Sequence, residues 1–143
     1  MKDKAPFNIL LADYDTDDCH LFEKALKEIP IATHLTTVSN GEVLMDYLLK
    51  NSTDLPDVLF LDLSMPRKTG YECLIEIKEN KKLEAIPLFV FTTSIPSNIL
   101  AEVKLSNTLV KFGALDYVRK PADFAQLKHV IHQAIIRVIE KVT

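Results

Sequence analysis

The sequence has few cysteines, no long apolar run and little net charge, and each shortage excludes a class of protein. Its 143 residues include only Cys19 and Cys73, which lie outside any CxxC or metal-ligand spacing, so neither a disulfide nor a zinc site is expected. No apolar stretch approaches the roughly 20 residues of a membrane span. Residues 1–6 lack the apolar segment of a signal peptide, so a cytoplasmic protein is expected.

The composition is that of one globular domain. Apolar residues make up 48% of the chain and charged residues 26%, with a formal net charge of −3. This mild acidity argues against broad binding to nucleic acid or to an anionic membrane. No linker, repeat or low-complexity segment divides the chain. We therefore expect a single domain over residues 1–143, with its core at about 7–141 and no output domain.

Strand and helix patterns alternate five times along the chain. The expected strands are 7–13, 33–39, 58–62, 88–92 and 114–120. The expected helices are about 17–28, 42–50, 69–80, a segment between 96 and 112, and a last helix that begins at Pro121. Strands that alternate with helices form a parallel sheet covered on both faces. The predicted fold class is therefore α/β, a doubly wound (βα)5 domain with five parallel strands.

Polar residues stand where the expected strands end. Asp13 and Asp15 follow the first strand, Asp62 ends the third, Thr92 ends the fourth and Lys120 ends the fifth. The carboxyl ends of parallel strands share one edge of the sheet, where open α/β sheets bind their ligands. Clustered carboxylates favour a hard cation such as Mg²⁺, and lysine and hydroxyl donors suit a phosphoryl group. The pattern predicts phosphoryl transfer onto Asp62.

The chain resembles response regulator receiver domains over nearly its whole length, and three motifs carry the resemblance. Residues 61–66 (Leu-Asp-Leu-Ser-Met-Pro) with Gly70 resemble the phosphoacceptor motif of that family. Residues 91–94 (Phe-Thr-Thr-Ser) resemble its switch-threonine segment, and residues 113–121 resemble its closing motif with a lysine before a proline. The resemblance implies a flavodoxin-like three-layer sandwich with strand order 2-1-3-4-5.

The resemblance also implies a role for each site residue. Asp62 would be the phosphoacceptor, Thr92 the hydroxyl that follows the phosphoryl group, Lys120 its ion-pair partner and Tyr117 the switch aromatic. The implied partners are a histidine kinase or phosphotransfer protein, which donates the phosphoryl group, and a separate downstream protein. The implied chemistry is phosphorylation and dephosphorylation of the chain itself, so no other enzymatic activity is expected.

The first strand departs from the pattern of the family. Receiver domains carry two adjacent acidic residues there, and the second is usually the direct metal ligand, whereas Tyr14 occupies that place here. A phenol is a poor ligand for Mg²⁺. The metal would be held by Asp13, Asp62 and the backbone carbonyl of Ser64, with Asp15 added if the chain turns it inward. Our hypothesis is that phosphorylation survives with reduced Mg²⁺ affinity.

Two other functions stay open at this point. The lost acidic residue at Tyr14 also fits a degenerate receiver, which would bind a protein partner without phosphate. Residues 11–16 further resemble the DxD segment of haloacid dehalogenase-like phosphatases. In that interpretation Asp13 would be the nucleophile and Asp15 the acid/base. It leaves the motif around Asp62 unexplained, and the chain is too short to include the cap of those enzymes.

Two segments suggest surfaces for a partner. The stretch between Thr92 and Lys120 is about six residues longer than the resemblance leads one to expect, and it predicts either a longer helix or an extended loop with a shorter helix. Residues 106–108 (Ser-Asn-Thr) are poor helix formers. The last helix carries a wide apolar arc, which predicts either deep burial within the domain or an added contact with a partner protein or in a homodimer. The arc consists of Phe124, Leu127, Val130, Ile131, Ala134, Ile135, Val138 and Ile139.

Overall fold

The computed structural model describes residues 6–93 and 98–142. Its strands are β1 (Phe7–Ala12), β2 (Thr33–Val38), β3 (Val58–Leu61), β4 (Leu88–Thr92) and β5 (Asp116–Arg119). Its helices are α1 (Thr16–Lys27), α2 (Gly41–Lys50), α3 (Gly70–Glu79), α4 (Ile99–Lys111) and α5 (Phe124–Val142). All neighbouring strands run parallel, in the order β2-β1-β3-β4-β5. The predicted fold class and strand order are therefore confirmed.

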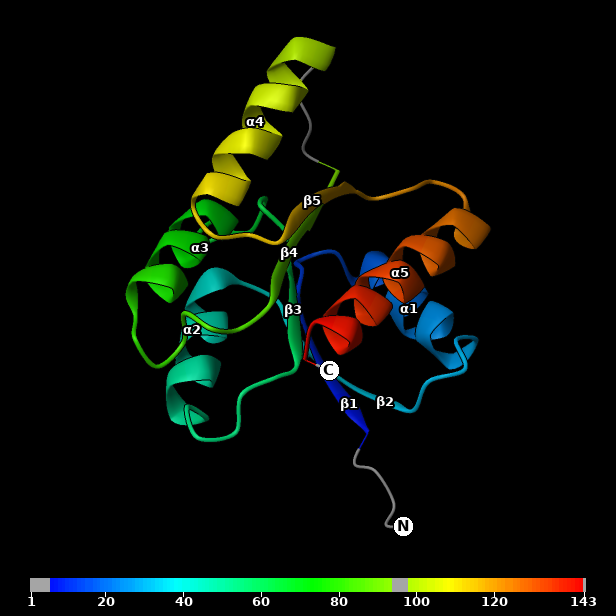
Figure 1. Ribbon diagram of the computed structural model, residues 1–143, viewed down its shortest axis with the longest axis horizontal. Helices are drawn as coiled ribbons and strands as arrows, with labels where there is room; N and C mark the ends of the chain where they lie inside the picture. Colours follow the sequence, from blue (N-terminus) through cyan, green and yellow to red (C-terminus); the bar gives the residue numbers. More distant parts are fainter. Residues whose placement is uncertain (1–5, 94–97, 143) are drawn as a thin grey trace.

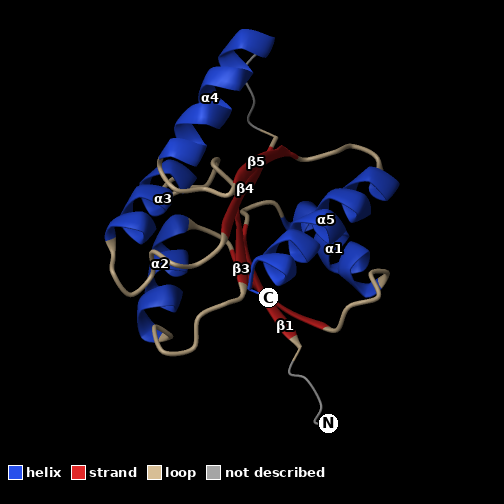
Figure 2. Cartoon of the chain, in the orientation of Figure 1, coloured by secondary structure: helices blue, strands red, loops and turns tan. Residues whose placement is uncertain are grey.

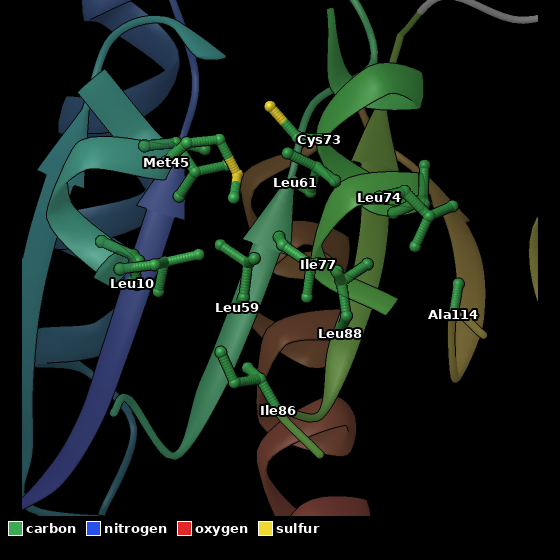
Figure 3. Packing of buried hydrophobic residues seen from close by; sticks show 14 of the residues in the cluster. Leu10, Met45, Leu59, Leu61, Cys73, Leu74, Ile77, Ile86, Leu88 and Ala114 are labelled. Carbon is green, nitrogen blue, oxygen red and sulfur yellow. The ribbon is translucent and has the colours of Figure 1, made fainter. Parts of the chain in front are cut away.

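The helices cover the two faces of the sheet in two groups. Figure 1 and Figure 2 show α2, α3 and α4 on one side of the sheet, with α1 and α5 on the other. Strand residues alternate between these faces. Leu59 and Leu88 pack with α2 and α3, as Figure 3 shows, whereas Phe60 and Phe89 pack with α1 and α5. Because both faces are covered, β3 and β4 are buried along their whole length, which explains their uninterrupted apolar sequence.

The last helix begins at Phe124, so the predicted start at Pro121 was wrong. Asp123 Oδ2 accepts a hydrogen bond from the backbone N–H of Gln126 at 3.0 Å, which caps the helix at that point. A residue before proline is also biased away from helical geometry. Strand β5 ends at Arg119, so Lys120 and Pro121 both lie in the connection between β5 and α5.

The apolar arc of α5 packs within the domain. Leu127, Ile131 and Ile135 are buried, and they belong to the same cluster as Phe22 of α1. The two helices lie side by side in Figure 1. Burial against α1 and the sheet explains the arc without a partner, and a homodimer stays a prediction. No helix in the part of the chain that the structure describes is long and apolar enough to cross a membrane.

The lengthened segment contains a regular helix. Helix α4 has 13 residues and includes the three residues that we judged to be poor helix formers. The Thr108 hydroxyl donates a hydrogen bond to the carbonyl of Lys104 at 2.8 Å, and Asn98 caps the first turn by accepting one from the N–H of Ala101. Residues 94–97, which include part of the predicted switch segment, lie outside the described residues.

Gly70 lets α3 begin directly against the backbone of Asp62. A Cβ atom at this position would lie 2.3 Å from the Asp62 carbonyl oxygen and 2.7 Å from Leu63 Cα, and backbone atoms cannot turn aside. A capping box then fixes the first turn, because the Thr69 side chain accepts from the Glu72 N–H and the Glu72 side chain accepts from the Thr69 N–H. The glycine and the capping box together place the start of α3 against the backbone of Asp62.

Candidate functional site

Lys120 lies at the centre of the polar cluster at the carboxyl edge of the sheet. Its Nζ is 2.5 Å from Asp13 Oδ2, 2.9 Å from Asp18 Oδ2 and 3.2 Å from Asp62 Oδ2. These carboxylates come from the end of β1, the first turn of α1 and the end of β3. Three carboxylates thus share one ammonium group, and two of their three charges are not balanced by Lys120.

Most of this cluster is withdrawn from solvent. Asp13 is 2% exposed and Asp62 is 6% exposed. The Lys120 side chain is 7% exposed, while that of Asp18 is 34% exposed and stands at the rim. Burying a charge is costly unless it is paired and hydrogen-bonded. The ion pairs with Lys120 therefore offset part of the cost of burying two carboxylates.

Both oxygens of Asp62 have polar partners. Its Oδ1 accepts hydrogen bonds from the Thr92 hydroxyl at 2.7 Å and from the Ser64 backbone N–H at 3.2 Å. Its Oδ2 faces Lys120. Thr92 is fully buried at the end of β4, the neighbour of β3 in the sheet. The structure thus brings the predicted Asp62, Thr92 and Lys120 together, with the carboxylate oriented from two sides.

The pKa values of Asp13 and Lys120 follow from burial and pairing. Burial raises the pKa of Asp13 to about 6, because desolvation outweighs the hydrogen bonds from Lys120 and from the Asp15 N–H. Burial lowers the pKa of Lys120, but hydrogen bonds to Asp13 and Asp18 outweigh it, so the pKa lies above its ordinary value. Lys120 is therefore charged at neutral pH, and an added cation would favour the ionised form of Asp13.

The two residues after Asp13 point away from the buried cluster. Tyr14 is 63% exposed. Asp15 Oδ1 accepts a hydrogen bond from the Asp18 N–H at 3.0 Å and caps α1. That carboxylate therefore serves the helix, and a role for Asp15 as a metal ligand stays a prediction. No group of three or more His, Cys, Asp or Glu side chains within residues 6–93 and 98–142 is arranged to hold a metal ion.

Asp18 is the site residue that sequence reasoning missed. Asp17 and Asp18 both lie in the first turn of α1, where negative charge is favourable near the N-terminus of a helix. Asp18 in addition pairs with Lys120. Helical side chains tilt toward the N-terminus of their helix, which turns a first-turn aspartate toward the strand ends. This tilt could have predicted from the sequence that Asp18 lies near the strand ends.

Tyr117, the predicted switch aromatic, packs beside the core. The ring, which lies in β5, contacts the cluster formed by α2, α3 and α4. Its hydroxyl is buried and has no hydrogen-bond partner among the residues that the structure describes. An unpaired buried hydroxyl costs about 1–3 kcal/mol. Among the described residues, the ring of Tyr117 is held by its packing against this cluster.

The donor chemistry of the site fits a divalent cation. Asp13 and Asp62 stand at the ends of the paired strands β1 and β3, and both are hard oxygen ligands. Mg²⁺ is often bound in proteins by one or two carboxylates, with water and substrate oxygens completing its coordination. The unbalanced negative charge around Lys120 favours such an ion further.

Comparisons with known proteins agree with this geometry. Residues 9–132 match the family model of the response regulator receiver domain. The chain is 28% identical over 131 residues to the probable methanogenesis regulatory protein FilR2 of Methanothrix harundinacea, which covers 90% of this chain and 81% of that protein. The Mn²⁺-bound form of response regulator Rcp1 matches with a TM-score of 0.77 at 27% identity, covering 90% of this chain and 91% of that one. The phosphorylated cyanobacterial phytochrome response regulator RcpA gives a TM-score of 0.77 at 28% identity, with the same coverage of 90% and 91%.

Proposed function

Because the chain belongs to the family of response regulator receiver domains, we propose that Asp62 is its phosphoacceptor. One observation carries the proposal. The Asp62 carboxylate lies between the Thr92 hydroxyl at 2.7 Å and the Lys120 ammonium at 3.2 Å. A carboxylate oxygen that can accept the phosphoryl group and two hydrogen-bond donors for the phosphoryl oxygens are therefore adjacent in one buried site. No other carboxylate in the described part of the cluster has this pair of partners.

The proposed reaction is a direct transfer of the phosphoryl group. A carboxylate oxygen of Asp62 forms a bond to phosphorus as the bond from phosphorus to the donor breaks, and the donor leaves with that electron pair. The Lys120 ammonium and the Thr92 hydroxyl donate hydrogen bonds to the transferred oxygens. A divalent cation held by Asp13, Asp62 and the Ser64 backbone carbonyl would neutralise phosphoryl charge.

The proposed partners follow from membership of the family. The donor is a histidine kinase or a phosphotransfer protein, and a separate protein reads the changed surface. We propose no enzymatic activity beyond gain and loss of the phosphoryl group at Asp62. The cytoplasmic location stays a prediction.

The two alternative functions receive less support. A phosphate-independent binding module would not need both the Thr92 hydroxyl and the Lys120 ammonium within hydrogen-bond distance of Asp62, yet both are. A phosphatase nucleophile at Asp13 would need donors for the phosphoryl oxygens around it. The two oxygens of Asp13 accept from Lys120 and from the Asp15 N–H, whereas the Thr92 hydroxyl donates to Asp62.

Incubation with a small acyl phosphate should test the proposal directly. We expect the intact protein to gain the mass of one phosphoryl group, faster with Mg²⁺ than with a chelator, because the cation offsets charge between the donor and the buried carboxylates. The chelated sample is the matched control. Failure to add phosphate under any of these conditions would contradict the proposal and leave the degenerate receiver as the better account.

Thr92→Val should separate phosphorylation from the response to it. The variant keeps the acceptor, Asp13 and Lys120, so we expect phosphoryl uptake to continue. It removes the hydroxyl that, in our proposal, moves to bind the phosphoryl group. The environment of the Tyr117 ring should therefore no longer change on phosphorylation. Ring signals of Tyr117 in NMR spectra, assigned with Tyr117→Phe, measure this change.

Thr92→Ser is the matched control, because it keeps the hydroxyl and should keep the Tyr117 response. An unchanged Tyr117 response in Thr92→Val would show that the hydroxyl does not link the two residues.

A further inference from the structure

Asp18 gives Lys120 a third carboxylate partner that phosphoryl transfer to Asp62 does not itself require. Its Oδ2 lies 2.9 Å from Lys120 Nζ, a shorter distance than the 3.2 Å between Lys120 and Asp62. With its side chain 34% exposed, Asp18 stands on the solvent side of the cluster, while Asp13 and Asp62 lie inside. The contact joins α1 to the end of β5.

The contact is anchored at both ends. The Asp18 backbone N–H donates to Asp15 Oδ1 at 3.0 Å, which fixes the first turn of α1. The Lys120 backbone N–H donates to the Thr92 carbonyl at 3.0 Å, which fixes the residue beside β4. Because hydrogen bonds hold the backbone of both residues, pairing of their side chains costs less conformational entropy. We therefore regard the Asp18–Lys120 pair as a stable part of the site.

Charge around Lys120 explains what the third carboxylate can do. Without Asp18, the Lys120 ammonium would balance half of the charge on Asp13 and Asp62 and would repel a cation that approached them. Asp18 offsets the ammonium charge from the rim and leaves more negative charge on the two inner carboxylates. Tyr14, which follows Asp13, is 63% exposed and supplies no carboxylate.

We propose that Asp18 supplies the charge that Tyr14 does not, and that it sets the affinity of the Asp13 and Asp62 pair for a divalent cation. Asp18 is a positioning residue here, because it acts through Lys120 and through its charge and is not itself a metal ligand. The inference rests on the proposed function, since it concerns the cation that serves phosphoryl transfer.

Binding of Mn²⁺ to the unphosphorylated protein tests this role. Electron paramagnetic resonance of free Mn²⁺ gives the dissociation constant without any phosphoryl chemistry. We expect Asp18→Asn to weaken binding on the order of tenfold, which is the Coulomb effect of one charge about 6 Å from a divalent ion when water screens the pair. Asp17→Asn removes the same charge one residue away, where the side chain is exposed, and should change affinity by less than about twofold.

A second substitution distinguishes charge from a structural effect. Asp18→Glu keeps the negative charge beside Lys120 and should bind Mn²⁺ with an affinity within about threefold of that of the original protein. Retained affinity in Asp18→Glu supports the proposal. Equal losses in Asp17→Asn and Asp18→Asn, or a loss in Asp18→Glu as large as that in Asp18→Asn, would overturn it.

The inference and the proposed function can fail separately. If Asp62 takes up phosphate but Asp18→Asn binds Mn²⁺ as the original protein does, only the role of Asp18 is wrong. If the original protein binds Mn²⁺ but takes up no phosphate, the proposed function is wrong and the Mn²⁺ measurements still decide the role of Asp18.

Discussion

Asp62→Asn should abolish uptake of a phosphoryl group from a small acyl phosphate. An amide has no carboxylate oxygen that can form the acyl phosphate, so the loss should be complete. The amide oxygen can still accept the hydrogen bonds that now come from Thr92 and Ser64, so the variant should fold. Intact mass after incubation with the phosphodonor measures uptake, and a thermal unfolding curve checks the fold.

The matched control is Asp57→Asn, at an exposed aspartate just before β3. Its Oδ2 accepts a hydrogen bond from the Asn8 N–H at 2.7 Å, and this bond does not involve the Lys120 cluster. An asparagine can accept the same hydrogen bond. This control should gain phosphate as the original protein does. Undiminished uptake by Asp62→Asn would mean that another residue is the acceptor.

Lys120→Met should destabilise the folded protein by about 3–5 kcal/mol at neutral pH, the usual cost of removing one partner of a buried ion pair. Methionine fills a similar volume, but it leaves Asp13 and Asp62 without a counter-charge in a place that solvent barely reaches. A domain of ordinary stability has about 5–15 kcal/mol in total, so the loss should be plain in chemical denaturation.

The pH dependence of this loss follows from Asp13. Its pKa is raised to about 6 by burial, so the unfolded chain ionises at lower pH than the folded one, and folding loses stability as pH rises from the ordinary value of 3.8 through about 6. Removing Lys120 raises the pKa further and deepens that loss. The pKa of Lys120 is itself raised above its ordinary value, so its own contribution is constant over this range. The difference between Lys120→Met and the original protein should therefore shrink as pH falls toward about 4.

Lys128→Met is the control for the lysine substitution. Lys128 pairs with Glu28 at 3.1 Å, but the two side chains are 39% and 45% exposed, so losing the pair should cost less than about 1 kcal/mol at any of these pH values. Equal costs for the two variants, or a cost for Lys120→Met that does not change with pH, would contradict the electrostatic account of the cluster.

Most of the fold was predictable because this sheet is covered on both faces. The apolar runs of β3 and β4, together with the five alternations of strand and helix, admit few other arrangements. The meeting of Asp62, Thr92 and Lys120 was predictable for the same reason, since each ends a strand and the strands are parallel.

The start of α5 and the separate roles of Asp15 and Asp18 could not be predicted, because neighbouring residues in the sequence suit the same role. Pro121 suits a first helical position, but the Asp123 side chain caps the helix further along. Asp15 and Asp18 are both acidic and both near the strand end, yet one caps α1 and the other reaches Lys120. Which carboxylate does which follows from where the helix starts, and helix ends are the least certain part of a sequence-based prediction.

The residue that carries the phosphoryl group is the most direct test of the central claim. Borohydride reduction of the phosphorylated protein converts an acyl phosphate into an alcohol, and peptide mass spectrometry then locates it. Asp13 and Asp62 fall in different tryptic peptides, since Lys24 and Lys50 lie between them. The account predicts the modification at Asp62 alone. Modification at Asp13, with Asp62 unchanged, would contradict it.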